Sequence, residues 1–238
     1  MSADLSIPGQ LLICMVGRAR GSDLVAVAKQ AGAHGGTIAL GRTINDSRIL
    51  QMLSLADVHQ DIVFTLLGSE AAVVLPAIID EAAKQPKKFA GTAVLVDVSE
   101  IFVRGTAQEK YAATENAHAR SVNMHSDYEL ITVIVNYGFA DSVMEIARKA
   151  GARGGTVLNA RGTGTEEDIK FFGITLVPEK EMLFIIAEKA KSSAILDAVN
   201  AIPNLCKPGG GIVFNLPVSR FIVLGKEQER LLRDKADG

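Results

Sequence analysis

Two ten-residue stretches, AKQAGAHGGT at residues 28–37 and ARKAGARGGT at residues 147–156, decide the fold because each is a near copy of the other. Seven of the ten aligned pairs are identical, at a spacing of 119 residues. The same spacing, held without a gap, aligns further apolar segments: LLICMV (11–16) with LITVIV (130–135), VFTLL (63–67) with MLFII (182–186), and GTAVLV (91–96) with GGIVFN (210–215). Similarity at one fixed spacing predicts a tandem duplication.

The second repeat shows most clearly what each copy folds into. Residues 129–137 form a β-branched apolar run that is typical of a strand. Asp141 is the expected N-cap of a helix that ends at Gly151, the expected C′ glycine. The remaining elements are expected as strands at 156–160 and 181–187, a helix at about 189–202, and strands at 212–215 and 219–224. The order β-α-β-β-α-β predicts a ferredoxin-like unit, an antiparallel sheet with both helices on one face.

The first repeat has the same order of elements, with expected strands at 11–17, 36–41, 61–67 and 91–97 and helices at 23–31 and 70–83. We therefore expect an α+β protein of two tandem ferredoxin-like (βαββαβ) domains. The predicted domains are residues 1–105 and 127–238, the second with a charged C-terminal tail, joined by a polar linker at 106–126. Each sheet would leave one apolar face without a helix. This predicts oligomerisation or close packing of the two domains.

The composition excludes several classes of function. Of the 238 residues, 48% are hydrophobic and 22% are charged, which supports a buried core and argues against disorder. A net charge of -2 and the absence of Trp argue against nucleic-acid binding. No apolar run reaches the roughly 18 residues of a membrane helix, and the N-terminal residues lack the pattern of a signal peptide. We expect a cytoplasmic protein.

No motif of a known catalytic class is present, so we expect no enzymatic activity. Cys14 lies in a predicted strand and is expected to be a small buried hydrophobe. Cys206 lies in a predicted loop, where the sequence places no histidine to activate it. His118 and His125 lie in the linker, and solvent exposure is a simpler interpretation for them than metal binding.

Two glycine-rich segments of the second repeat form the candidate ligand site. One follows the second strand and the other precedes the fourth: Arg161, Gly162, Thr163, Gly164 and Thr165, then Lys207, Gly209, Gly210 and Gly211. Consecutive backbone N–H groups can form an anion-binding nest, and glycine lets a ligand approach them closely. The alternative interpretation is two turns that only require positive φ. In a ferredoxin-like unit the two segments need not meet within one subunit, and they can meet across a subunit interface.

These segments resemble those of the PII-type nitrogen-regulatory signal-transduction proteins. The resemblance rests on AGARGGTVLNARGTG (150–164), on Pro178 before the third strand, and on PGGGIVF (208–214). It implies a trimer that binds an adenine nucleotide (ATP, ADP or AMP) in clefts between subunits. It further implies a mobile loop, here residues 163–173, that acts on a target protein such as a transporter or an enzyme. The segment from Arg161 would lie against the base and ribose, and Gly209 and Gly210 would hold the phosphates.

The sequence departs from the family's pattern at its cationic positions. Acidic or apolar residues stand where the family has lysines or arginines: Glu179, Glu181, Gly211, Ile222 and Leu224. Lys207 or Arg220 would replace part of that charge, since phosphate binding depends on cations and N–H donors. A structural scaffold that has lost its ligand is therefore the alternative function. A small enzyme or a metal-binding trimer is a third class, and no residue cluster supports it.

The first repeat keeps less of the pattern. Arg42 matches Arg161, but Thr43, Ile44 and Asn45 follow it, so both loop glycines are missing. We expect the first repeat to be structural or to bind a different ligand.

Overall fold

The computed structural model describes residues 5–44, 57–103, 126–161, 170–171, 174–175, 179–203, 205 and 210–225. The chain forms two compact units whose segments alternate along the sequence. The first unit holds residues 1–39, 60–126 and 217–238, and the second holds residues 40–59 and 127–216. Each unit therefore contains a segment from the other repeat.

The first unit is an antiparallel sheet in the order β2–β3–β1–β4–β11 with two helices. Its elements are β1 (Leu5–Gly17), α1 (Gly21–Gln30), β2 (Thr37–Ile44), β3 (Asp57–Leu67), α3 (Ala71–Lys84), β4 (Gly91–Val103) and β11 (Arg220–Leu224). The chain passes into the second unit within β2, after Ala39. The core packs the inner faces of both helices against the sheet, with Leu24, Leu75 and Ile78 among its fully buried side chains.

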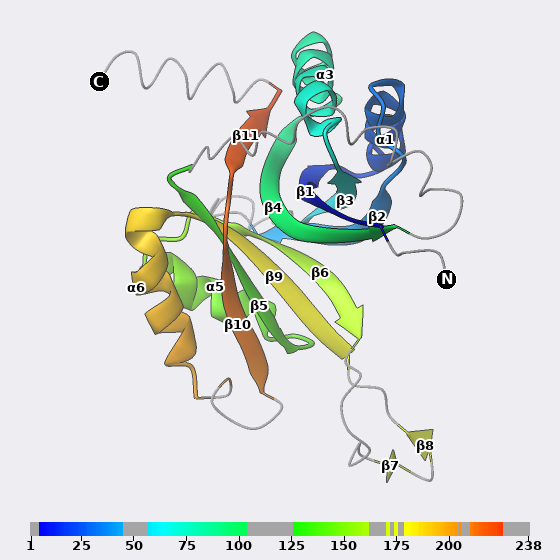
Figure 1. Ribbon diagram of the computed structural model, residues 1–238. Helices are drawn as coiled ribbons and strands as arrows, with labels where there is room; N and C mark the ends of the chain where they lie inside the picture. The colour runs from blue at the N-terminus through cyan, green and yellow to red at the C-terminus, as the bar shows by residue number, and fades with distance from the viewer. Residues whose placement is uncertain are drawn as a thin grey trace. The chain divides into compact units, whose positions relative to one another are not determined.

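The second unit has strands in the order β10–β5–β9–β6, followed by the end of β2. Its elements are β5 (Tyr128–Asn136), α5 (Ala140–Lys149), β6 (Gly155–Arg161), β9 (Glu179–Glu188), α6 (Lys189–Asn200) and β10 (Gly211–Pro217). A short hairpin, β7 (Lys170–Phe171) with β8 (Ile174–Thr175), lies between β6 and β9 in the chain. Figure 1 shows α5 and α6 along the same sheet, and their core includes Met144, Ile185 and Ile195.

Both units have the strand order of a ferredoxin-like fold. Numbered within each unit, the four core strands lie in the order 4-1-3-2, as β4–β1–β3–β2 and as β10–β5–β9–β6. The predicted fold class is confirmed, and most predicted elements lie within a few residues of those observed. The largest differences are β1, which begins at Leu5, and β4, which continues to Val103. The duplication itself remains a prediction from the sequence.

The repeated AGA segments end helices in the same way. Gly32 and Gly151 have φ values of 108° and 111°, a conformation that favours glycine. After α5, the Gly151 N–H donates to the Arg148 carbonyl and the Ala152 N–H donates to the Ala147 carbonyl. The equivalent two bonds follow α1. This is the Schellman arrangement, and the prediction that Gly151 is the C′ residue is confirmed.

The predicted start of α5 is wrong in one respect. Phe139, not Asp141, is the N-cap residue, and no side chain of the N-cap accepts a hydrogen bond from the helix. Asp141 lies inside the first turn, where its charge still favours the helix dipole. The acceptor for the first N–H groups comes from a different element, β9.

Strand β10 alternates between the two faces of the sheet. Val213 packs against the core of the second unit, whereas Ile212 and Phe214 are exposed. The predicted oligomer stays a prediction. None of the described helices is long and apolar enough to span a membrane.

Candidate functional site

The candidate site lies at one end of the sheet of the second unit. Strand β6 ends there at Arg161, which is paired with Glu179 at the start of β9. Strand β5 also ends there, with Asn136 opposite Lys180. Strand β10 begins there at Gly211, beside the carbonyl of Ile134. Both glycine-rich segments therefore leave the sheet at the same end.

The predicted site residues fall in three groups. Arg161 is exposed at the end of β6, and Gly210 and Gly211 lie half-buried at the start of β10. Arg220 is in β11, which pairs with β4 in the first unit. Outside the described residues lie Gly162, Thr163, Gly164, Thr165, Lys207 and Gly209, together with most of the predicted mobile loop. Because β9 and β5 lie between β6 and β10, about 14 Å separates Arg161 from Gly211 within the unit.

Gly211 is required by packing rather than by an unusual φ. A Cβ atom at this position would lie 2.8 Å from the Ile134 carbonyl oxygen and would overlap the Leu205 side chain. A side chain here would force β10 away from β5. The glycine thus lets β10 begin close to the end of β5.

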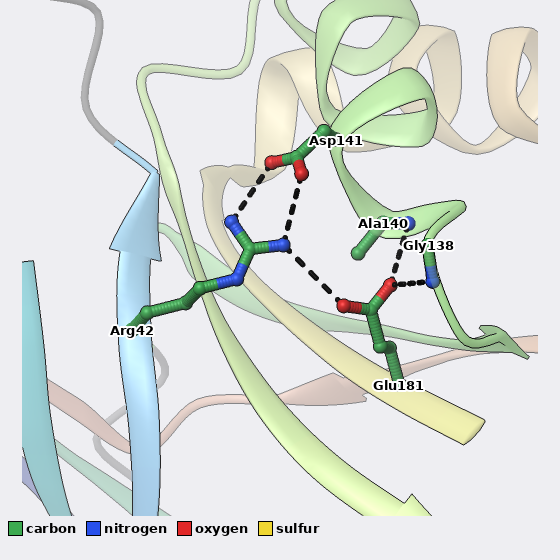
Figure 2. Close-up of polar contacts among 5 residues, drawn as sticks. All are labelled: Arg42, Gly138, Ala140, Asp141 and Glu181. Carbon is green, nitrogen blue, oxygen red and sulfur yellow. Dashed lines mark hydrogen bonds and ion pairs between the residues drawn. The ribbon is translucent and has the colours of Figure 1, made fainter. Parts of the chain in front are cut away.

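Glu181 is a buried carboxylate that holds the turn between β5 and α5. Its Oε2 accepts hydrogen bonds from the N–H groups of Gly138 and Ala140, each at 3.0 Å (Figure 2). Only 4% of its side chain is exposed. The negative charge therefore satisfies two N–H groups at the positive end of the α5 dipole. An external anion would find these donors already occupied.

Arg42, from the first repeat, completes this cluster. Its strand pairs with β6, with Arg42 opposite Val157. The guanidinium donates to both carboxylate oxygens of Asp141, at 2.9 and 3.0 Å, and lies 3.4 Å from Oε1 of Glu181 (Figure 2). Asp141 is largely exposed, whereas Arg42 is mostly covered. One cation thus neutralises two carboxylates that approach from different elements.

The first unit has an equivalent of Glu181 that the sequence comparison missed. Asp61 is buried, lies opposite Val16, and its Oδ2 accepts a 2.8 Å hydrogen bond from the N–H of Gly21 at the start of α1. Glu181 lies opposite Val135, the residue that aligns with Val16.

The strand registers therefore correct the spacing between the repeats. A Cβ atom at Gly36 would meet the Phe64 carbonyl, and one at Gly155 would meet the Phe184 carbonyl. The two glycines are 119 residues apart, whereas the two phenylalanines are 120 residues apart. The spacing between the repeats is therefore 120 residues from β3 and β9 onward. The constant spacing of 119 placed Asp61 opposite Lys180 and concealed the match. An alignment with one residue inserted between β6 and β9 pairs Asp61 with Glu181.

Metal-ligand clusters and cysteine thiols are two kinds of reactive group that can be assessed among the described residues. Among the described residues, no group of three His, Cys, Asp or Glu side chains could hold a metal ion. Cys14 is fully buried, and this burial raises the pKa of its thiol from 9.0 to about 12. A neutral, enclosed thiol is a poor nucleophile.

Comparison with known protein families gives a match for one region of the chain. Residues 128–228 match the family model described as nitrogen regulatory protein P-II. No protein in a search of curated sequences matches.

The solved structures that are similar show only low overall agreement. A putative PII-like signalling protein from Thermus thermophilus has 16% identity and a TM-score of 0.29, over 44% of this chain and 98% of that one. Aspartate kinase from Synechocystis has 12% identity and a TM-score of 0.30, over 89% of this chain and 44% of that one. Neither similarity supports an argument about function.

Proposed function

We propose, from the match of residues 128–228 to the family model described as nitrogen regulatory protein P-II, that this chain is a PII-like regulatory protein that binds a small effector through its second unit. The effector is an adenine nucleotide or a related anion, bound where Arg161–Thr165 of one subunit meet Lys207–Gly211 of another. Binding changes the loop 163–173, which then acts on a target protein in the cytoplasm. The chain works by binding, not by catalysis.

The observation that carries this proposal is that both glycine-rich segments leave the same end of one sheet. Arg161 ends β6 and Gly211 begins β10 at that end, yet two strands separate them. One ligand would need the two segments from different copies of the unit. A homo-oligomer, three chains by the family pattern, is therefore part of the proposal.

Calorimetric titration of the purified chain with ADP, ATP and AMP, with and without Mg²⁺, tests the proposal. We expect one site per chain with micromolar affinity. Gly162→Ala should abolish the heat while the protein stays folded. Gly35→Ala is the matched control, because the nearest atom to its Cβ would be Lys29 Cε at 3.9 Å. No heat with any nucleotide would refute nucleotide sensing.

A second function, a ligand-free interaction scaffold, is favoured by the electrostatics around Glu181. Arg42, which reaches Glu181 in β9, is already bound by two carboxylates. The N–H groups of Gly138 and Ala140 are also occupied. A scaffold predicts an oligomer in sedimentation whose mass and stability do not change when millimolar nucleotide is added.

A further inference from the structure

Strand β10 is an edge strand of the second unit. It stands at one end of the strand order, hydrogen-bonded to β5, and none of the described strands pairs with its outer edge. The backbone N–H and C=O groups along such an edge can pair with another strand. Natural edge strands often carry a lysine, a proline or a bulge that prevents this pairing. The segment Gly211–Leu216 contains no proline and no charged residue, and Pro217 only ends the strand.

Large apolar side chains are exposed beside this edge. Val213 packs against the core of the second unit, so the alternation of a strand places Ile212, Phe214 and Leu216 together on the opposite face. The exposed fractions of Ile212 and Phe214 are 60% and 39%. Strand β11, at the other end of the strand order, has no exposed residue. Strand β10 therefore differs from β11 in offering exposed apolar side chains to a partner strand.

The sequence of β10 fits a second copy of itself. Ile212 and Leu216 stand two residues before and two residues after Phe214. When two copies pair in antiparallel order about Phe214, that residue faces the partner's Phe214, and Ile212 faces the partner's Leu216. Every apolar side chain on this face then meets an apolar one. Because β10 carries no charge, no like charges oppose each other across the pair.

We propose that β10 is the contact through which two copies of this chain join their sheets, edge to edge, about a twofold axis at Phe214. Each copy supplies the same strand, so the contact closes after two chains and leaves no free edge at β10. It also removes exposed apolar surface of Ile212 and Phe214 from water. The contact involves neither the effector nor its loop, so it does not rest on the proposed function. Together with a threefold assembly, it would join two trimers into six chains.

Disulfide cross-linking of the full chain tests the register of this contact. The background variant is Cys206→Ser, in which the remaining native thiol, Cys14, is buried. Phe214→Cys should form a disulfide between copies on oxidation, because its two Cα atoms would lie about 5 Å apart. Ile212→Cys is the matched control at a more exposed position of the same face. Its two Cα atoms would lie about 13 Å apart along the paired strands, which is too far for a disulfide.

A mixture of two variants makes the register test sharper. Ile212→Cys and Leu216→Cys chains should each fail to cross-link alone but should cross-link when mixed in equal amounts, because the two positions face each other. If Ile212→Cys alone cross-links as readily as Phe214→Cys, the copies meet by random collision and the proposal is overturned. If no variant or mixture cross-links, the proposal is also overturned, and the edge is left for a strand of another protein.

Sedimentation equilibrium tests the same contact without oxidation. Phe214→Lys should halve the mass of the assembly, because two lysines would face each other across the axis. Val73→Lys is the control, since Val73 on α3 is as exposed as Ile212, and it should leave the mass unchanged. An unchanged mass in Phe214→Lys would overturn the proposal. A fall to one third would also overturn it, because Phe214 would then belong to a threefold contact. If Phe214→Lys does not fold, the cross-linking of Phe214→Cys against Ile212→Cys decides the question.

Discussion

Replacing Glu181 by alanine should destabilise the second unit more than replacing Asp61 destabilises the first. Glu181→Ala leaves the buried N–H of Ala140 and the partly buried N–H of Gly138 without acceptors. Each lost bond to a charged acceptor costs about 1.5 kcal/mol, so we expect about 3 kcal/mol in total. Arg42 keeps Asp141 as a partner and adds little. Asp61→Ala removes the acceptor of a single N–H, so about 1.5 kcal/mol is expected.

Urea unfolding at neutral pH, followed by far-UV circular dichroism, measures this difference. Each unit contains two helices among its described residues, so the signal follows the unfolding of both. At an m-value of about 2 kcal/mol/M, Glu181→Ala should lower the midpoint by about 1.5 M. Glu181→Gln should fall between wild type and Glu181→Ala, since its amide oxygen still accepts hydrogen bonds. The reasoning is refuted if Asp61→Ala costs as much as Glu181→Ala, or if Glu181→Ala leaves the midpoint unchanged.

Two other substitutions test the packing and the buried thiol. Gly155→Ala should cost about 1–3 kcal/mol by overpacking, because its Cβ would lie 2.7 Å from Leu183 Cδ1 and 2.9 Å from Met144 Sδ. Thermal unfolding should show a lower midpoint for this variant but not for Gly35→Ala, and equal midpoints would contradict the packing argument. Native Cys14 should not react with a thiol reagent at pH 8 until the chain unfolds. Because its folded pKa is raised from 9.0 to about 12, its contribution to stability is complete below pH 9 and lost as pH rises toward 12. Cys14→Ala should flatten this alkaline loss, and a native thiol titrating near pH 9 would show that the site is open.

The sequence predicted the elements well because each repeat carries strong local signals. Gly151 ends α5 as expected, since only glycine readily adopts the positive φ of a Schellman turn. The apolar runs form strands as expected, because their alternation and their β-branched residues suit a sheet. The repeat also supports the prediction of each element, because a pattern that occurs in both copies is less easily accidental.

The parts that sequence reasoning missed depend on long-range contacts. Asp141 has the residue type of an N-cap, yet the acceptor comes from Glu181, 41 residues away from Ala140 in the chain. Arg42 reaches Asp141 across 99 residues. No local pattern encodes such a contact. From the sequence, Glu181 is only an acidic residue where a cation is expected. Its burial and its two hydrogen bonds to the start of α5 give it a structural role.

The alternation of segments between the two units has a consequence for cutting the chain. A nick between residues 104 and 125 would give one fragment that carries Gly41–Ile44, the strand that extends the second unit, and another that carries β11, the strand that pairs with β4. Each fragment would lack a strand that the other supplies. Limited proteolysis in this interval should therefore yield two pieces that stay together under native conditions. Such a chain is suited to fragment complementation, in which two inactive halves recover their structure only on meeting.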